Sequence, residues 1–148
     1  MKKYLLSILI IATGLMAQSP SAAHEETKIT CVVSGEAIDA TETASYKDGK
    51  VYFCCAGCKA DFEESSAKFS TAANFQLVAT GQYTQTTCPF TGRKMKTSKA
   101  LEVNGTTVTL CCDRCYKKTN KSKDKVSLIF SDEPFKKGFE IAAKKSSK

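Results

Sequence analysis

Histidine is almost absent from this chain, which contains a single one, His24. One imidazole excludes histidine-rich catalytic centres. The sequence also lacks a Ser-His-Asp set, a paired-carboxylate arrangement and a phosphate-binding loop. We therefore expect no enzymatic activity, and we look for the chemistry of the chain in other side chains.

A hydrophobic run long enough to span a bilayer is also missing. The apolar run from Tyr4 to about Ala17 follows two lysines and precedes the small residues 21–23. This order is typical of a secretory signal peptide, and the run is too short to span a membrane comfortably. We interpret residues 1–23 as a signal peptide. The mature product is predicted to be periplasmic or secreted, with no stable membrane span after cleavage.

The charge of the chain is only mildly unbalanced, with a formal net charge of +7 at pH 7. Its lysines gather around Lys117 to Lys125 and again near the C-terminus. Such clusters are usually solvated helix faces, and an exported protein seldom meets nucleic acid. We expect no nucleic-acid partner, and the sequence identifies no protein partner.

Cysteine, in contrast, is abundant, with eight in the chain. The cysteines form two sets of identical spacing, in which a lone cysteine precedes a cluster of three by twenty-three positions. The first set is Cys31, Cys54, Cys55 and Cys58, and the second set is Cys88, Cys111, Cys112 and Cys115.

An offset of 57 residues relates the two cysteine sets. The same offset aligns residues 31–35 with 88–92 and still holds at residues 68–70 and 125–127. A match that persists over about forty positions indicates a tandem duplication.

The duplication predicts two modules, at residues 31–82 and 88–148. We expect a linker at 83–87 between them and a flexible lead-in at 24–30. Each module has only about fifty to sixty residues, too few for a generous hydrophobic core, so covalent or metal cross-links are expected in either case.

Within each module the local pattern predicts a loop at the first cysteine, then a β-hairpin, then a helix, which places the chain in the α+β class. Asp48-Gly49 and Asn104-Gly105 favour hairpin turns because both central residues of such a turn must tolerate a positive φ. β-branched and aromatic residues follow both pairs, as in strands.

Two further segments complete the secondary-structure prediction. The apolar residues 75–78 predict a short strand, with residues 126–130 as its counterpart in the second module. Ser131, followed by two acidic residues, predicts the start of an additional C-terminal helix that continues through Phe135 to Lys145.

The spacing allows sulfurs that are distant in sequence to converge on a metal ion. Cys55 and Cys58 are separated by two residues and Cys54 and Cys58 by three, so either pair can meet Cys31 near the start of the helix. Backbone amides at that helix start favour the thiolate form that metals bind. We predict cysteine metal sites and leave open whether Cys55 and Cys112 are ligands.

The motif Cys-x-x-Ser/Thr-Gly, followed after a gap by Tyr-Phe-Cys-x-x-x-Cys-x-x-x-Phe, resembles that of the YHS and TRASH metal-binding domains. The match falls on Cys31, Cys54, Cys58 and Phe62, and in the second copy on Cys88, Cys111 and Cys115. The resemblance implies small treble-clef-like modules that handle heavy metals.

The chain departs from the pattern of these domains at two kinds of position. Ser34 and Thr91 stand where many of them have a second ligand, and Thr119 stands where the first copy has Phe62. Hydroxyl groups are poor ligands for soft metals, so a fourth ligand would come from Cys55 or Cys112.

Four thiolates around a tetrahedron suit Zn²⁺, whereas two or three thiolates suit Cu(I), and the spacing does not choose between them. We predict an exported heavy-metal-binding protein that sequesters, delivers or senses Zn or Cu(I). One alternative is a disulfide-stapled structural or interaction module of the cell envelope, because exported compartments are oxidising. A thiol-disulfide redox protein is a weaker alternative, because the pattern lacks a thioredoxin-like βαβ unit.

Overall fold

The computed structural model describes residues 29–142, and the structural statements below refer to this part of the chain. The expected signal peptide and most of the expected lead-in lie outside it. Within residues 29–142, no helix has the length and apolar character needed to cross a membrane. We call residues 30–85 the first repeat and residues 87–142 the second repeat, since the 57-residue offset relates them.

The elements of the two repeats follow the same order, a hairpin and then helices and a short strand. The first repeat contains β1 (Asp39–Tyr46), β2 (Gly49–Phe53), α1 (Ala56–Glu64), the 3₁₀ helix η1 (Ser66–Phe69), α2 (Ser70–Ala79) and β3 (Tyr83–Gln85). The second contains η2 (Thr97–Lys99), β4 (Ala100–Val103), β5 (Thr106–Thr109), α3 (Asp113–Lys121), α4 (Lys125–Phe130), α5 (Asp132–Gly138) and β6 (Phe139–Ile141). The α+β class is confirmed.

The hairpins form as predicted, but one of their turns lies elsewhere. In the second repeat the turn is Asn104-Gly105, with φ values of 47° and 74°. In the first repeat the turn residues are Lys47 and Asp48, with Lys47 at φ 52°, and Gly49 already belongs to β2. Gly49 has a different role, because a Cβ atom there would lie 2.6 Å from the Cδ2 atom of Leu77. This glycine allows α2 to approach the hairpin.

The strand predicted at residues 75–78 is wrong, because this segment belongs to α2, and its counterpart at 126–130 belongs to α4. The helix α2 packs against β2, β3, α4 and α5. A helix surrounded on several sides carries apolar residues around much of its circumference, and such a short apolar run has the same appearance as a buried strand.

The C-terminal helix is shorter than predicted, since α5 ends at Gly138 and the chain continues directly into β6. The strand β6 pairs with β3, which lies within the interval 83–87 that we expected to be a linker. These two strands are equivalent elements of the two repeats.

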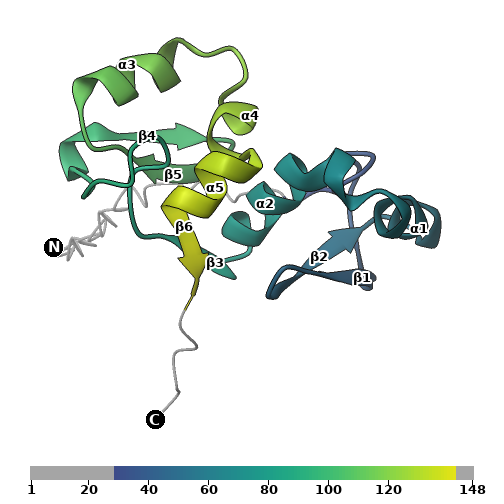
Figure 1. The fold of residues 1–148 in the computed structure, drawn as a ribbon. Helices are drawn as coiled ribbons and strands as arrows, with labels where there is room; N and C mark the ends of the chain where they lie inside the picture. The colour runs from purple at the N-terminus through teal and green to yellow at the C-terminus, as the bar shows by residue number, and fades with distance from the viewer. Residues whose placement is uncertain (1–28, 143–148) are drawn as a thin grey trace, which may run out of the picture.

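The β3–β6 ladder is symmetric with respect to the duplication. Thr84 pairs with Glu140, and the 57-residue offset maps this pair onto Ile141 and Tyr83, which form another row of the same ladder. The repeats therefore associate as a fused pair related by an approximate twofold axis. In Figure 1 this strand pair, together with α2 and α5, lies between the β1–β2 hairpin and the β4–β5 hairpin.

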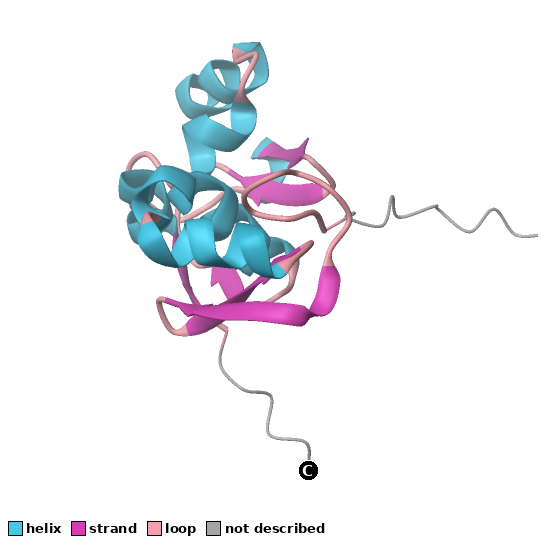
Figure 2. Cartoon of the chain, turned by 90° about the vertical axis from the view of Figure 1, so that its right-hand side faces the viewer, coloured by secondary structure: helices cyan, strands magenta, loops and turns pink. Residues whose placement is uncertain are grey.

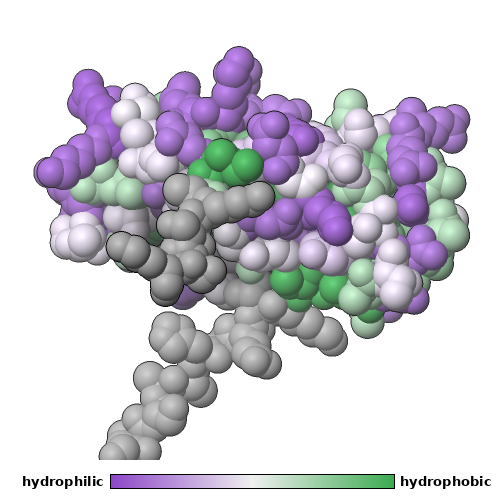
Figure 3. All heavy atoms as spheres, turned by 90° about the horizontal axis from the view of Figure 1, so that it is seen from below, coloured by the Kyte–Doolittle hydropathy of each residue, from purple (hydrophilic) through white to green (hydrophobic). Residues whose placement is uncertain are grey.

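The buried side chains form one core that runs through both repeats, from Cys31 in the first to Phe139 in the second. In the first repeat Phe62 packs against the rings of Tyr46, Phe53 and Phe69. Figure 2 views the molecule from the side of the first repeat and shows its helices stacked above the hairpin. Hydrophilic side chains cover much of the face seen in Figure 3.

A buried asparagine of the first repeat contacts the second repeat at the junction between α4 and α5. Pro134 has no N–H to donate to the carbonyl group of Phe130, four residues before it. The fully buried side chain of Asn74 fills this position, because its Nδ2 atom donates to the Phe130 carbonyl oxygen at 2.9 Å and to Asp132 Oδ1 at 3.0 Å. Its Oδ1 atom accepts from Lys47 Nζ at 2.7 Å.

The substitution Asn74→Ala should lower the free energy of unfolding by about 2 kcal/mol, because it leaves the buried Phe130 carbonyl without a donor. Chemical denaturation of the variant and the parent measures this loss. Asn120→Ala, on the exposed face of α3, is the control and should change the stability by no more than about 0.5 kcal/mol. Equal effects of the two substitutions would contradict this account of the repeat interface.

Candidate metal centres

A tight turn presents the first cysteine of each set. The Cys31 N–H donates to the Glu36 carbonyl at 2.7 Å, and the Gly35 N–H donates to the Cys31 carbonyl at 2.9 Å. In the second repeat the Gly92 N–H donates to the Cys88 carbonyl at 2.8 Å. Both glycines have a positive φ, 75° and 68°, which is why the motif requires glycine at this position.

A strand-to-helix junction presents the other cysteines. Cys54 directly follows β2, Cys55 is the N-cap residue of α1, and Cys58 lies in the first turn of that helix. In the second repeat Cys112 is the N-cap residue of α3. The sulfurs of each cluster therefore gather at the start of a helix, opposite the turn that carries the first cysteine.

Turn and junction meet in both repeats. The Sγ atoms of Cys31, Cys54 and Cys58 all lie within 4.8 Å of one another, and so do those of Cys88, Cys111 and Cys115. We call these groups the first triad and the second triad. The predicted convergence of sulfurs more than twenty positions apart is thus observed in each half of the chain.

The fourth cysteine of each set lies beside its triad. The Cys55 Sγ atom is 3.7 Å from that of Cys54, and the Cys112 Sγ atom is 3.6 Å from that of Cys115. Within the triads, Cys54 and Cys58 are 3.6 Å apart. A tetrahedral site with metal–sulfur bonds of about 2.3 Å has sulfur–sulfur edges of about 3.8 Å, and these separations match such an edge. Cys55 and Cys112 nevertheless lie outside the groups whose sulfurs are all within 4.8 Å of one another, so each fourth sulfur is beside its triad without forming a four-sulfur cluster with it.

All eight cysteines are free thiols in this structure. Sulfur separations of 3.6 to 3.9 Å within the sets are well above the disulfide bond length of about 2.05 Å. Each set is therefore a group of neighbouring thiols with metal-site spacing.

The first cysteine of each set is readily ionised. Burial is the strongest single influence on Cys31 and opposes its ionisation, but hydrogen bonds from the Ser34 side chain and from nearby backbone amides outweigh it and lower the pKa to about 6. Burial likewise opposes ionisation of Cys88, and the amides of Phe90 and Cys111 lead the interactions that lower its pKa to about 7.

The helix cysteine of each triad keeps its proton. Its hydrogen bond with Cys54, followed by desolvation, raises the pKa of Cys58 to about 12. Desolvation, followed by its hydrogen bond with Cys112, raises the pKa of Cys115. A triad thus combines an acidic thiol with one that gives up its proton only when a cation replaces it.

The fourth cysteines are favourably placed for ionisation. The backbone amide of Cys58 is the main cause that lowers the pKa of Cys55, and the amide of Cys115 does the same for Cys112. The start of a helix is a region of positive potential that stabilises a thiolate. These two cysteines are thus chemically suited to act as ligands.

A hydroxyl group supports each triad. The Ser34 Oγ atom is 3.3 Å from Cys54 Sγ, and the Thr91 Oγ1 atom is 3.2 Å from Cys111 Sγ. Hydroxyl groups are poor ligands for soft metals, and the structure places these two next to the sulfurs as hydrogen-bond partners. The sequence contains a signal for this role, because both motifs have a hydroxyl residue at the same position, Ser34 and Thr91.

A glutamine side chain fixes the turn to the hairpin in each repeat. In the first, Gln76 donates through Nε2 to the carbonyl groups of Thr30 and Tyr52 at 2.8 and 3.1 Å, and accepts from the Tyr52 N–H at 2.7 Å. In the second, Gln85 makes the same three bonds to Thr87 and Thr109.

These glutamines are not equivalent in sequence, since Gln76 belongs to α2 and Gln85 to β3. Their four backbone targets, in contrast, are related by the 57-residue offset. Each target pair stands just before the first and the second cysteine of its set. The glutamines therefore hold the turn that carries the first cysteine against the strand that leads to the second. An alignment of the repeats does not reveal this role, because the two glutamines are at non-equivalent positions.

Comparison of the chain with protein-family models, with curated proteins and with solved structures found no match. The interpretation of the two triads therefore stands on their geometry.

Removal of either hydroxyl should weaken metal binding at its own triad. We expect Ser34→Ala to lower zinc affinity of the first triad, and Thr91→Ala that of the second, by about tenfold to a hundredfold, as is typical for groups that orient a ligand. Competition with a chromophoric chelator measures both affinities. Ser34→Thr and Thr91→Ser exchange the two natural hydroxyls and should retain affinity, whereas equal losses in all four variants would indicate a packing effect.

The pKa values of Cys31 and Cys88, about 6 and about 7, predict different pH dependences for the two triads. A triad must displace one additional proton to bind metal once the pH falls below the pKa of its first cysteine. Between about pH 7 and pH 6, zinc affinity should thus fall more steeply at the second triad. Zinc titrations of Cys58→Ser and Cys115→Ser, which each retain one intact triad, measure the two profiles, and coincident profiles would contradict the assignment.

Proposed function

We propose that this chain is an exported protein that binds two heavy-metal ions, one in each repeat, through cysteine thiolates. One observation carries the proposal: in each repeat, a turn cysteine and two junction cysteines place their Sγ atoms within 4.8 Å of one another. If the cysteines served only as apolar core residues, their sulfurs would not need to cluster in the same way at equivalent positions of both repeats. The role of such a protein is sequestration, delivery or sensing of the metal.

The donor set favours a soft or borderline metal ion. Each site offers sulfur alone, with hydroxyl and backbone donors around it, and such sites select Zn²⁺ or Cu(I) over Mg²⁺ and Ca²⁺. The fourth sulfur distinguishes the two candidates. Coordination by Cys55 and Cys112 completes tetrahedral four-sulfur sites suited to zinc, and coordination by the triads alone leaves three-sulfur sites suited to Cu(I).

The resemblance to YHS and TRASH domains supports the same proposal. Both repeats have a turn, a hairpin and a helix in this order, with cysteines in the turn and at the start of the helix. This is the order expected of treble-clef-like metal modules. The departures at Ser34 and Thr91 agree with it as well, because these residues support the thiolates as hydrogen-bond partners.

The proposed protein is a binder and not an enzyme, and export follows from the expected signal peptide at residues 1–23. Disulfide formation is the competing outcome, since the same neighbouring thiols can become oxidised in an oxidising compartment. An oxidised pair does not ligate, so the two outcomes are distinguishable by mass.

The reduced full chain should bind two equivalents of zinc or Cu(I). With zinc, Cys58→Ser and Cys115→Ser should each retain one tightly bound equivalent, and the double variant none, because every change removes one sulfur from one triad and leaves fewer than four thiolates. Native mass spectrometry counts the bound ions. Protein from its own compartment that carries no metal and has lost all eight thiol protons would instead support the disulfide-stapled module.

A further inference from the structure

The two triads differ in how far they are shielded from solvent. In the second, Cys88, Cys111 and Cys115 have exposed fractions of 0, 6 and 5%. In the first, Cys31 is buried, but Cys54 and Cys58 are only half-buried. The fourth cysteines follow the same trend, because Cys55 is exposed and Cys112 is half-buried.

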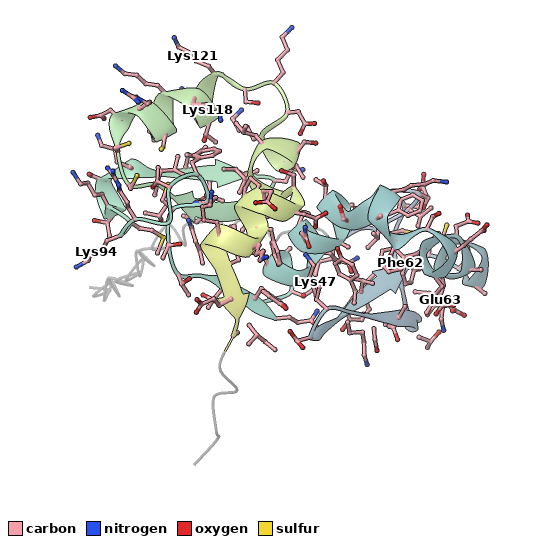
Figure 4. All side chains as sticks on the ribbon, viewed as in Figure 1. Lys47, Phe62, Glu63, Lys94, Lys118 and Lys121 are labelled. Carbon is pink, nitrogen blue, oxygen red and sulfur yellow. The ribbon has the colours of Figure 1, made fainter. Side chains whose placement is uncertain are left out.

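The two repeats also differ in the charge of equivalent residues. At five positions of the turn, the hairpin and the helix, an acidic residue of the first repeat is replaced by a basic residue at the equivalent position of the second. The acidic residues are Glu36, Asp39, Glu42, Asp61 and Glu64, and their basic counterparts are Arg93, Lys96, Lys99, Lys118 and Lys121. In Figure 4 Lys121 extends outward from α3 of the second repeat, and Lys118 lies beneath that helix.

Two of these basic residues contact residues close in sequence to the cysteines of the second set. Lys99 forms an ion pair with Asp113 in the first turn of α3, with Nζ and Oδ1 2.6 Å apart. Lys118 places its Nζ atom 4.5 Å from the ring centre of Phe90, which lies in the turn next to Cys88. The equivalent residues of the first repeat include Glu42 and Asp61, which cannot make these contacts.

We propose that the two metal sites have different roles: the first exchanges its ion with a positively charged, thiol-bearing partner, and the second retains its ion as part of the structure. This inference rests on the proposed metal binding. It is carried by the difference in burial, by the charge inversion and by the contacts of Lys99 and Lys118, which are independent observations.

Exchange between thiolate sites proceeds by ligand substitution. A thiolate of the partner forms a bond to the metal as one cysteine sulfur of the chain gives up its own, and the metal keeps its oxidation state. The released sulfur remains a thiolate or takes a proton from water. This step requires the incoming sulfur to reach the metal, which the exposed side of the first site permits and the burial of the second opposes.

Charge directs the partner to the first site. Carboxylates around a partly exposed centre attract cations and raise the rate of their association by about tenfold or more at low ionic strength. The basic residues around the second site repel the same partners. Because exposed charges are screened by salt, the preference should weaken at high ionic strength.

A release experiment on the full chain tests the division of roles. The protein is loaded with two equivalents of zinc, challenged with a neutral chelator, and quenched at intervals with a thiol-alkylating reagent. Peptide mass spectrometry then reports which cysteine set has become reactive. We expect the first set to be released at least about tenfold faster, and equal rates or faster release from the second set would overturn the proposal.

The role of charge is tested with two thiol peptides, one rich in lysine and one rich in glutamate, each with a Cys-x-x-Cys pair. The lysine-rich peptide should remove zinc from the first site faster, and Glu64→Lys should reduce this advantage. Lys121→Glu is the matched control in the second repeat and should leave release from the first site unchanged. The same rates with both peptides would overturn the charged-partner part of the proposal.

The two proposals fail in different ways. A reduced chain that takes up no zinc or Cu(I) refutes metal binding itself. A chain that binds two ions and releases both at one rate keeps the proposed function and refutes the division of roles.

Discussion

Electrostatic repulsion between crowded sulfurs is the constraint on which each repeat depends. Two unit charges about 4 Å apart repel by about 4 kcal/mol at an effective dielectric constant of 20, so the three sulfurs of a triad do not ionise together without a cation. Hydrogen bonds decide which sulfur carries the charge: those from Ser34 and nearby amides lower the pKa of Cys31 against the effect of burial, whereas the hydrogen bond with Cys54, then desolvation, and only last the charge of Cys31 raise the pKa of Cys58. A bound cation turns the repulsion into attraction, and the amides and hydroxyls of the turn already favour the thiolate state.

The duplication is a structural requirement as well as a repetition of sites. Among residues 29–142, β3 and β6 pair only with each other, so either repeat alone would leave a strand without this partner. Gln85, in the first repeat's β3, holds the turn and the hairpin of the second triad through Thr87 and Thr109. The geometry of the second site thus depends on the first repeat, and the two modules act as one folding unit.

The sequence predicted the α+β class and the convergence of each cysteine set because these depend on local pattern and spacing. It misplaced one hairpin turn because Asp48-Gly49 has the composition of a turn, whereas Gly49 is needed for close packing against Leu77. It missed α2 because a buried helix and a short strand share the same apolar run. Gln76 and Gln85 could not be found, because their targets lie on other elements and become neighbours only in the folded chain.

The two proposed metal sites have the same cysteines but different surroundings. The strength with which an ion is held and the ease with which another ligand reaches it can therefore differ independently. The cysteines, the turn glycine and the supporting hydroxyl are shared by both repeats, and in the proposed sites they would govern how strongly an ion is held. Burial and surface charge differ between the repeats, and they govern how easily another ligand reaches the ion. A duplicated chain can therefore change the exchange rate of one site through residues such as Asp61 and Lys118 while every ligand stays in place. The five charge inversions fall on this second group of residues, around the ligands and not among them, which is the distribution that divergence in exchange rate requires.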